Sequence, residues 1–163
     1  MIFIGVDPGK SGALARIGHY SVSVQPMPVI PGRNSRPEYD LVQIRNWLLV
    51  LMTPGQLFVT VERSQPLPPK MRGTIANFQR GVACGWQWML LGMAIPHQLV
   101  RPQDWQKVML TGTPGLDTKQ RSIIAAQRLF PEVSLLRTER SRKPDHNLSD
   151  ALLIAEFGRR THR

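Results

Sequence analysis

Three acidic residues stand where secondary-structure elements are expected to begin or end. Asp7 closes one apolar run and Glu62 closes another. Asp150 opens an apolar segment, and His146 precedes it by one helical turn. Carboxylates in such places cost stability unless a cation compensates them. The pattern predicts a divalent-metal site that acts on a phosphate backbone.

The charge balance of the chain supports this interpretation. The 163 residues include 21 Lys plus Arg but only 11 Asp plus Glu, which gives a formal net charge of +10 and a pI of about 11.0. Such a charge is typical of proteins that bind nucleic acid. The hydrophobic content of 42% indicates a globular chain and argues against disorder.

Two basic stretches are candidates for DNA contact. The stretch 63–107 also holds Trp86, Trp88 and Trp105, and aromatic rings among positive charges can stack on exposed bases. The alternative is that Trp86 and Trp88 are core or interface residues of a helix. The second stretch, before His146, is predicted to contact phosphate and contains Arg137, Arg140, Arg142 and Lys143.

Other patterns bear on the setting of the protein. No apolar run approaches the roughly 20 residues of a membrane-spanning helix, so no membrane partner is predicted. The first apolar stretch lacks a preceding basic region and ends in Asp7, which argues against a signal peptide. The single cysteine, Cys84, excludes an internal disulfide and a cysteine metal cluster. These features predict an intracellular, cytoplasmic protein.

Hydrophobic periodicity and turn residues predict the order of the elements. Strands are expected at 1–7, 13–17, 21–24, 57–62 and 97–100, and a loop at 26–38. Helices are expected at about 41–52, 72–93, 102–110, 118–130 and 148–160, the first of them capped by Asp40. This order predicts one domain, residues 1–163, of the α/β class, with a mixed sheet and helices on both faces. Asp7 and Glu62 would then end neighbouring strands.

Three motifs together resemble RuvC-type Holliday-junction resolvases of the ribonuclease H-like superfamily. They lie at 4–9, at Glu62-Arg63-Ser64, and at 143–155. The resemblance covers nearly the whole chain. Glu62-Arg63-Ser64-Gln65-Pro66 and Lys119-Gln120-Arg121-Ser122 are similar to the branch found in phages and chloroplasts, which hints at a viral source.

The resemblance implies a ribonuclease H-like fold and a homodimer that cuts four-way or other branched DNA. It also implies that Lys119 lies near the scissile phosphate. The chain departs from the bacterial pattern at Asn147, where many relatives carry an acidic ligand. The phage and chloroplast pattern places the ligand at His146 instead, and Asp145 remains the competing candidate.

The expected chemistry is phosphodiester hydrolysis with two Mg²⁺ ions, which neutralise the phosphate, activate water and stabilise the leaving oxygen. Asp7 would bridge the ions, Glu62 would hold one side, and His146 and Asp150 the other. An imidazole ligand is also compatible with Mn²⁺.

Several alternatives accompany this interpretation. The chain could be a non-catalytic nucleic-acid-binding module, or a ribonuclease H-like nuclease that acts on other branched DNA. Residues 5–11 imitate a phosphate-binding loop but lack its spacing. An actin-like or sugar-kinase fold would need a second domain, for which the chain has no room. On the helix at 72–93, an apolar stripe forms either the dimer interface or part of the monomer core; it consists of Phe78, Val82, Trp86 and Met89.

Overall fold

The computed structural model describes residues 1–51, 56–63 and 74–162; the side chains of 74–80 and 83 are not described. Its strands are β1 (Ile2–Asp7), β2 (Ala13–Ile17), β3 (Val22–Pro26), β4 (Val29–Pro31), β5 (Pro37–Tyr39), β6 (Leu57–Glu62) and β7 (His97–Val100). Its α-helices are α1 (Leu41–Leu51), α2 (Thr74–Gly92), α3 (Pro102–Met109), α4 (Thr118–Leu129) and α5 (His146–Thr161). The Ser64-Gln65-Pro66 part of the motif that begins at Glu62 lies outside the described residues.

Five strands form one mixed sheet in the order β3-β2-β1-β6-β7. The first three make an antiparallel meander, whereas β6 and β7 run parallel to β1. Parallel strands need a crossover, which α2 provides between β6 and β7. The α/β class with a mixed sheet, predicted from the sequence, is therefore confirmed.

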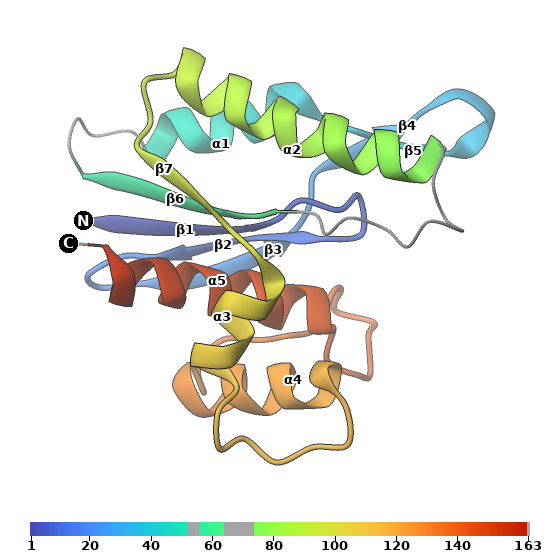
Figure 1. The fold of residues 1–163 in the computed structure, drawn as a ribbon. Coiled ribbons are helices and arrows are strands. Elements are labelled where there is room, and N and C mark those ends of the chain that lie inside the picture. The colour runs from blue at the N-terminus through green and yellow to red at the C-terminus, as the bar shows by residue number, and fades with distance from the viewer. Residues whose placement is uncertain (52–55, 64–73, 163) are drawn as a thin grey trace.

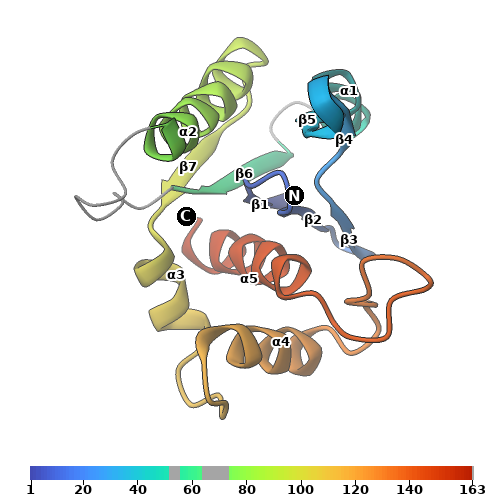
Figure 2. The same ribbon diagram turned by 90° about the vertical axis from the view of Figure 1, so that its right-hand side faces the viewer.

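Helices cover both faces of this sheet (Figure 1). Helices α1 and α2 lie on one face, and α5 lies on the other with α3 and α4 beyond it (Figure 2). Each face has its own apolar cluster: Ile4, Val6 and Leu14 belong to the α1–α2 side, while Ala13 and Ala15 belong to the α5 side. The central strand β1 is thus buried on both faces, as its unbroken apolar run predicts.

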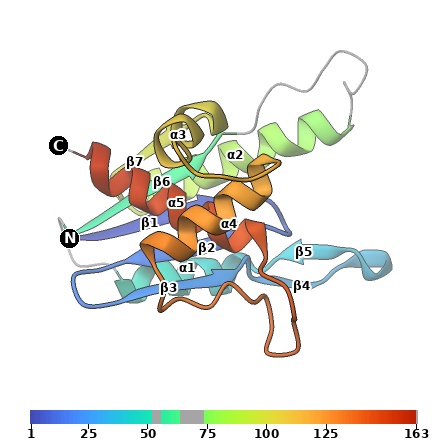
Figure 3. The ribbon, with the colours of Figure 1, turned by 90° about the horizontal axis from the view of Figure 1, so that it is seen from below.

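Helix α5 packs directly on the centre of the sheet (Figure 3). A Cβ atom at Gly5 of β1 would stand 2.0 Å from the Ala151 carbonyl oxygen and 2.4 Å from the Ala155 amide nitrogen. Only glycine allows this approach. The N-terminal end of α5 therefore lies at the same end of the sheet as Asp7, and both chain termini lie at the other end (Figure 1).

The segment predicted as a loop at 26–38 is instead a short hairpin. Strands β4 and β5 pair antiparallel and are joined by a 3₁₀ turn at Arg33–Ser35. The turn uses left-handed backbone at Asn34 and Ser35, with φ angles of 57° and 58°. Strands of three residues carry too little periodicity to be recognised in a sequence.

The starts of α1 and α5 are both set by a capping aspartate. Asp40 does cap α1, because its Oδ1 accepts the Gln43 amide at 2.8 Å. Helix α5 begins at His146, two residues earlier than expected, because Asp145 caps it and its Oδ1 accepts the Asn147 amide at 2.9 Å. Within the described residues, no helix is both long and apolar enough to cross a membrane.

Candidate active site

Asp7 and Glu62 lie side by side at one edge of the sheet. The parallel register pairs Val6 with Val61, so the next residue of each strand is an acid. Past Asp7 the chain turns sharply, with the Gly12 amide donating to the Gly9 carbonyl at 2.9 Å. A Cβ atom at Gly12 would stand 2.2 Å from the Asp7 carbonyl oxygen, so this turn requires glycine. The prediction that the two acids end neighbouring strands is confirmed.

Asp150 approaches the same place from α5. It lies in the second turn of that helix, after the Asp145 cap, and does not open the helix as the sequence suggested. The Asp150 Oδ1 accepts a short hydrogen bond from the Ser122 hydroxyl of α4. Ser122 is fully buried and also contacts the Ser149 hydroxyl at 3.1 Å.

The three carboxylates share a poorly solvated site. Burial raises the pKa of Asp7 to about 6, that of Glu62 to about 7 and that of Asp150 to about 7. Repulsion adds to burial, because the Asp7 charge raises the pKa values of Glu62 and Asp150. Burial and the Asp7 charge likewise raise the pKa of Tyr39 to about 12, and its hydroxyl donates to the Pro8 carbonyl at 2.8 Å. Such perturbed groups in one place are typical of functional sites.

Trp105 is a buried residue, although its position in a basic stretch of the sequence suggested an exposed ring that could stack on DNA bases. Its side chain is 0% exposed, and its indole Nε1 donates to Glu62 Oε2 at 2.7 Å. A buried ring cannot stack on a DNA base, so that expectation is wrong for Trp105. Trp86 is 5% exposed and belongs to the α1–α2 core, whereas Trp88 is 75% exposed.

Asp145 and His146, the two competing ligands, have different surroundings. Asp145 caps α5, and its Oδ2 accepts from Arg137 Nη1 at 2.6 Å. Burial raises the pKa of Asp145, but hydrogen bonds from Arg137 and Asn147 outweigh it and the net pKa is lowered. Both Asp145 oxygens are therefore engaged in local bonds. In the structure Asp145 therefore caps α5 and pairs with Arg137.

His146 is the first residue of α5, and its side chain is 32% exposed. Burial and the positive charge of Lys119 lower its pKa, so the ring is neutral near pH 7 and able to bind a cation. Lys119 also lowers the pKa of Asp150 slightly against the effect of burial. The structure thus brings Lys119 into electrostatic range of His146 and Asp150, from the first turn of α4.

The basic stretch before α5 is partly committed to the protein itself. Arg137 donates to the Ser11 carbonyl at 2.8 Å as well as to Asp145, so it ties the turn after β1 to the cap of α5. Arg140, Arg142 and Lys143 are exposed. The sequence did not show that Arg137 differs from its basic neighbours.

The donor set fits a hard divalent cation. Asp7, Glu62 and Asp150 form no ion pair with any residue that the structure describes. Oxygen ligands are those that Mg²⁺ prefers. Across residues 1–51, 56–63 and 74–162, however, no three His, Cys, Asp or Glu side chains are gathered closely enough to hold a metal ion. A bound cation would have to draw the carboxylates together.

The raised pKa values predict a pH-dependent stability in metal-free buffer. An acid whose folded pKa exceeds its unfolded value binds more protons when folded, so stability falls as pH rises from about 4 to about 7. Asp7→Asn removes one of these charges and relieves its two neighbours. We expect Asp7→Asn to raise the melting temperature more at about pH 8 than at about pH 4.5. Thermal melts in EDTA measure this, and an equal shift at both pH values would contradict it.

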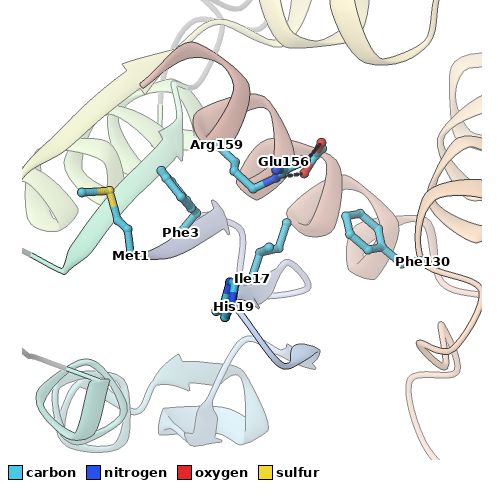
Figure 4. A pocket seen from close by; sticks show the side chains of 8 residues that line it. Met1, Phe3, Ile17, His19, Phe130, Glu156 and Arg159 are labelled. Carbon is cyan, nitrogen blue, oxygen red and sulfur yellow. Dashed lines mark hydrogen bonds and ion pairs between the residues drawn. The ribbon is translucent and has the colours of Figure 1, made fainter. Parts of the chain in front are cut away.

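A separate hollow of about 410 Å³ lies at the opposite end of the sheet (Figure 4). Phe3, Ile17 and Phe130 line it together with Glu156 and Arg159. The Glu156 carboxylate is buried but accepts hydrogen bonds from both Arg159 and Arg160, at 2.6 to 2.8 Å. The charge of Glu156 is therefore balanced by two arginines, whereas Asp7, Glu62 and Asp150 at the other end of the sheet have no ion pair with a described residue.

No protein-family model matches the sequence, and no curated protein matches it. Among solved structures, Thermus thermophilus RuvC in complex with Holliday junction substrate is similar, with a TM-score of 0.57 and 18% identity over 99% of this chain and 96% of that one. A second Thermus thermophilus RuvC structure gives 0.54 and 17%, over 98% and 96%.

This chain has a RuvC-like fold. At these identities the similarity concerns the arrangement of elements along nearly the whole length of both chains. The ribonuclease H-like sheet predicted from three short motifs is thereby confirmed. The resemblance to the phage and chloroplast branch stays a prediction.

Proposed function

We propose that this protein is a metal-dependent endonuclease that resolves four-way DNA junctions by paired, symmetric phosphodiester cleavage. The observation that carries the proposal is the trio Asp7, Glu62 and Asp150: three partly buried carboxylates with raised pKa values and no ion-pair partner among the described residues, at one end of a RuvC-like sheet. A net charge of +10 on the same chain suits a nucleic-acid substrate.

Asp7, Glu62, His146 and Asp150 are the proposed ligands of two Mg²⁺ or Mn²⁺ ions. When bound, these ions would neutralise the phosphate and activate the attacking water. The Asp7 charge acts on both Glu62 of β6 and Asp150 of α5, so Asp7 is the proposed bridging ligand. Mutual repulsion among these carboxylates would favour the binding of a cation, because each carboxylate would gain a counter-charge.

Lys119 is the proposed contact to the phosphate that is cut. It lies on α4 within electrostatic range of Asp150 and His146, so an anionic group entering the site would meet its ammonium group. The exposed residues of the basic loop, Arg140, Arg142 and Lys143, would contact flanking phosphates. Arg137 would act indirectly, by holding that loop against Asp145 and Ser11.

Two symmetric cuts need two active sites, so we propose a homodimer. The supporting surface is on α2, where Trp88 and Leu91 are 75% and 62% exposed. An apolar hollow of about 570 Å³ lies beside it between α1 and α2, lined in part by Val82 and Met89. Trp86, in contrast, is a core residue, and the Phe78 side chain lies outside the described residues.

Incubation with a labelled four-way junction and Mg²⁺ tests the function. A resolvase gives two nicked duplexes with cuts at symmetric positions. A non-catalytic binding module gives a shifted band and intact strands, and a nuclease for other branched DNA prefers flaps or forks over junctions. Either of the last two results would replace the proposal.

The assignment of His146 can be tested against Asp145 by paired substitutions. We expect His146→Ala to lose nearly all cleavage, because it removes a ligand. Asp145→Ala should keep most activity but lower the melting temperature, because it removes the cap of α5, typically worth about 1 kcal/mol. Cleavage rates and thermal melts on both variants decide the matter; the reverse ranking of rates would move the ligand to Asp145.

A further inference from the structure

Two buried hydrogen-bond donors contact the proposed metal-binding carboxylates from the helices below the sheet. The Trp105 indole on α3 donates to Glu62, and the Ser122 hydroxyl on α4 donates to Asp150. Both donor side chains are 0% exposed. Neither is charged, so each can orient a carboxylate without neutralising it.

Trp105 is fixed in place by the core around it. Helix α3 starts with Pro102 at its first position, and Trp105 packs in the apolar cluster that includes Met109 and Val100. A ring held this firmly has little rotational freedom. Its Nε1 proton therefore points in a constant direction, and it engages only Oε2 of Glu62.

Ser122 is fixed in a similar way but by polar contacts. Its hydroxyl lies 3.1 Å from that of Ser149, which in turn donates to the His146 carbonyl at 2.8 Å. This short chain of hydroxyl groups connects α4 to the first turn of α5. It engages only Oδ1 of Asp150.

We propose that Trp105 and Ser122 are positioning residues: each holds one oxygen of a metal-binding carboxylate and so presents the other oxygen to a divalent cation. The proposal rests on the metal-dependent chemistry proposed above. Partners that orient metal ligands in this way typically contribute about 10- to 100-fold in metal affinity. Glu62 and Asp150 have separate donors on separate helices, so each donor can be removed without disturbing the other hydrogen bond.

The test for Trp105 is the substitution Trp105→Phe, which keeps an aromatic ring but removes the N–H donor. Metal affinity is measured by calorimetry with Mg²⁺ and by electron paramagnetic resonance with Mn²⁺, in the absence of DNA. We expect about 10-fold weaker binding. Trp47→Phe on α1 is the matched control, since it makes the same change on the other side of the sheet, and it should bind metal like the wild type.

A spectroscopic measurement separates positioning from a purely structural role. The indole N–H resonances of the four tryptophans are followed by nitrogen-15 NMR, and the one absent in Trp105→Phe is assigned to Trp105. We expect this resonance to shift when Mg²⁺ is added and when Glu62 is replaced by Gln, while that of Trp47 stays in place.

Ser122→Ala tests the second donor, with Thr113→Val as its control. Both remove one buried hydroxyl, but only Ser122 donates to a carboxylate, whereas the Thr113 hydroxyl has no hydrogen-bond partner among the described residues. Ser122→Ala should weaken metal binding about 10-fold, and Thr113→Val should change it little. Thermal melts of both variants show whether a loss of folding accounts for the result.

The outcomes are distinct. Wild-type metal affinity in both Trp105→Phe and Ser122→Ala would overturn the positioning roles and leave the junction-resolving function standing. Weakened binding in these variants, from a wild type that does not cut junctions, would support the positioning roles and reject that function. A wild type that binds neither Mg²⁺ nor Mn²⁺ would overturn both.

Discussion

Asp7→Asn is expected to reduce junction cleavage by roughly 1,000-fold or more while junction binding survives or tightens. The reason is that Asp7 is the proposed bridging ligand, since its charge acts on both Glu62 and Asp150. Metal ions contribute several kcal/mol of transition-state stabilisation, and each 1.36 kcal/mol corresponds to a tenfold change in rate. Glu62→Gln and Asp150→Asn should behave alike. Removing a negative charge beside an anionic substrate explains why binding does not fall.

Asp104→Asn provides the matched control for this series. Asp104 is an exposed acid paired with Arg101 at 2.8 Å, on a helix next to the site. The same chemical change there should leave the cleavage rate within about twofold, as surface pairs contribute little. Single-turnover cleavage and band-shift titrations measure both quantities. If the Asp7 variant lost binding and melted early, its role would be structural.

Replacing Mg²⁺ by Ca²⁺ is expected to abolish cleavage and preserve junction binding. Ca²⁺ binds oxygen ligands at longer distances and with looser geometry, which does not suit alignment of the attacking water. Mn²⁺ should support cleavage, because an imidazole such as that of His146 is a better ligand for it than for Mg²⁺.

The metal experiment needs one control that reports on the protein itself. Melting temperatures in EDTA, Mg²⁺ and Ca²⁺ should show that each cation stabilises the fold at about pH 8, because each cation offsets the charges of the three partly buried carboxylates. Full cleavage in EDTA would exclude the metal mechanism. Stabilisation without cleavage in Mg²⁺ would leave a metal-binding protein that is not a nuclease.

The sheet and the acids at its edge could be predicted from the sequence by itself, because both are marked by patterns of neighbouring residues. Apolar runs that end abruptly in Asp7 and Glu62 mark buried strands, and the carboxyl ends of parallel neighbours meet at one edge. The sequence also singled out Asp150, because this acid stands directly before an apolar segment that was predicted to be helical. The hairpin formed by β4 and β5 could not be predicted from the sequence, because its strands are short, mostly exposed and held mainly by backbone pairing.

Only the tertiary structure decided what surrounds each acid. Trp105 meets Glu62 across 43 residues, and Ser122 meets Asp150 across 28. No local sequence pattern predicts contacts between residues so far apart in the chain. These contacts form because α3 and α4 pack against α5 under the sheet. The same holds for Asp145, whose capping bonds and Arg137 partner separate it from His146 although the two are neighbours in the chain. Residue types and spacing thus determined which acids stand at the ends of β1 and β6 and before the apolar part of α5, whereas packing determined how buried they are, which donors hold them and how far their pKa values rise.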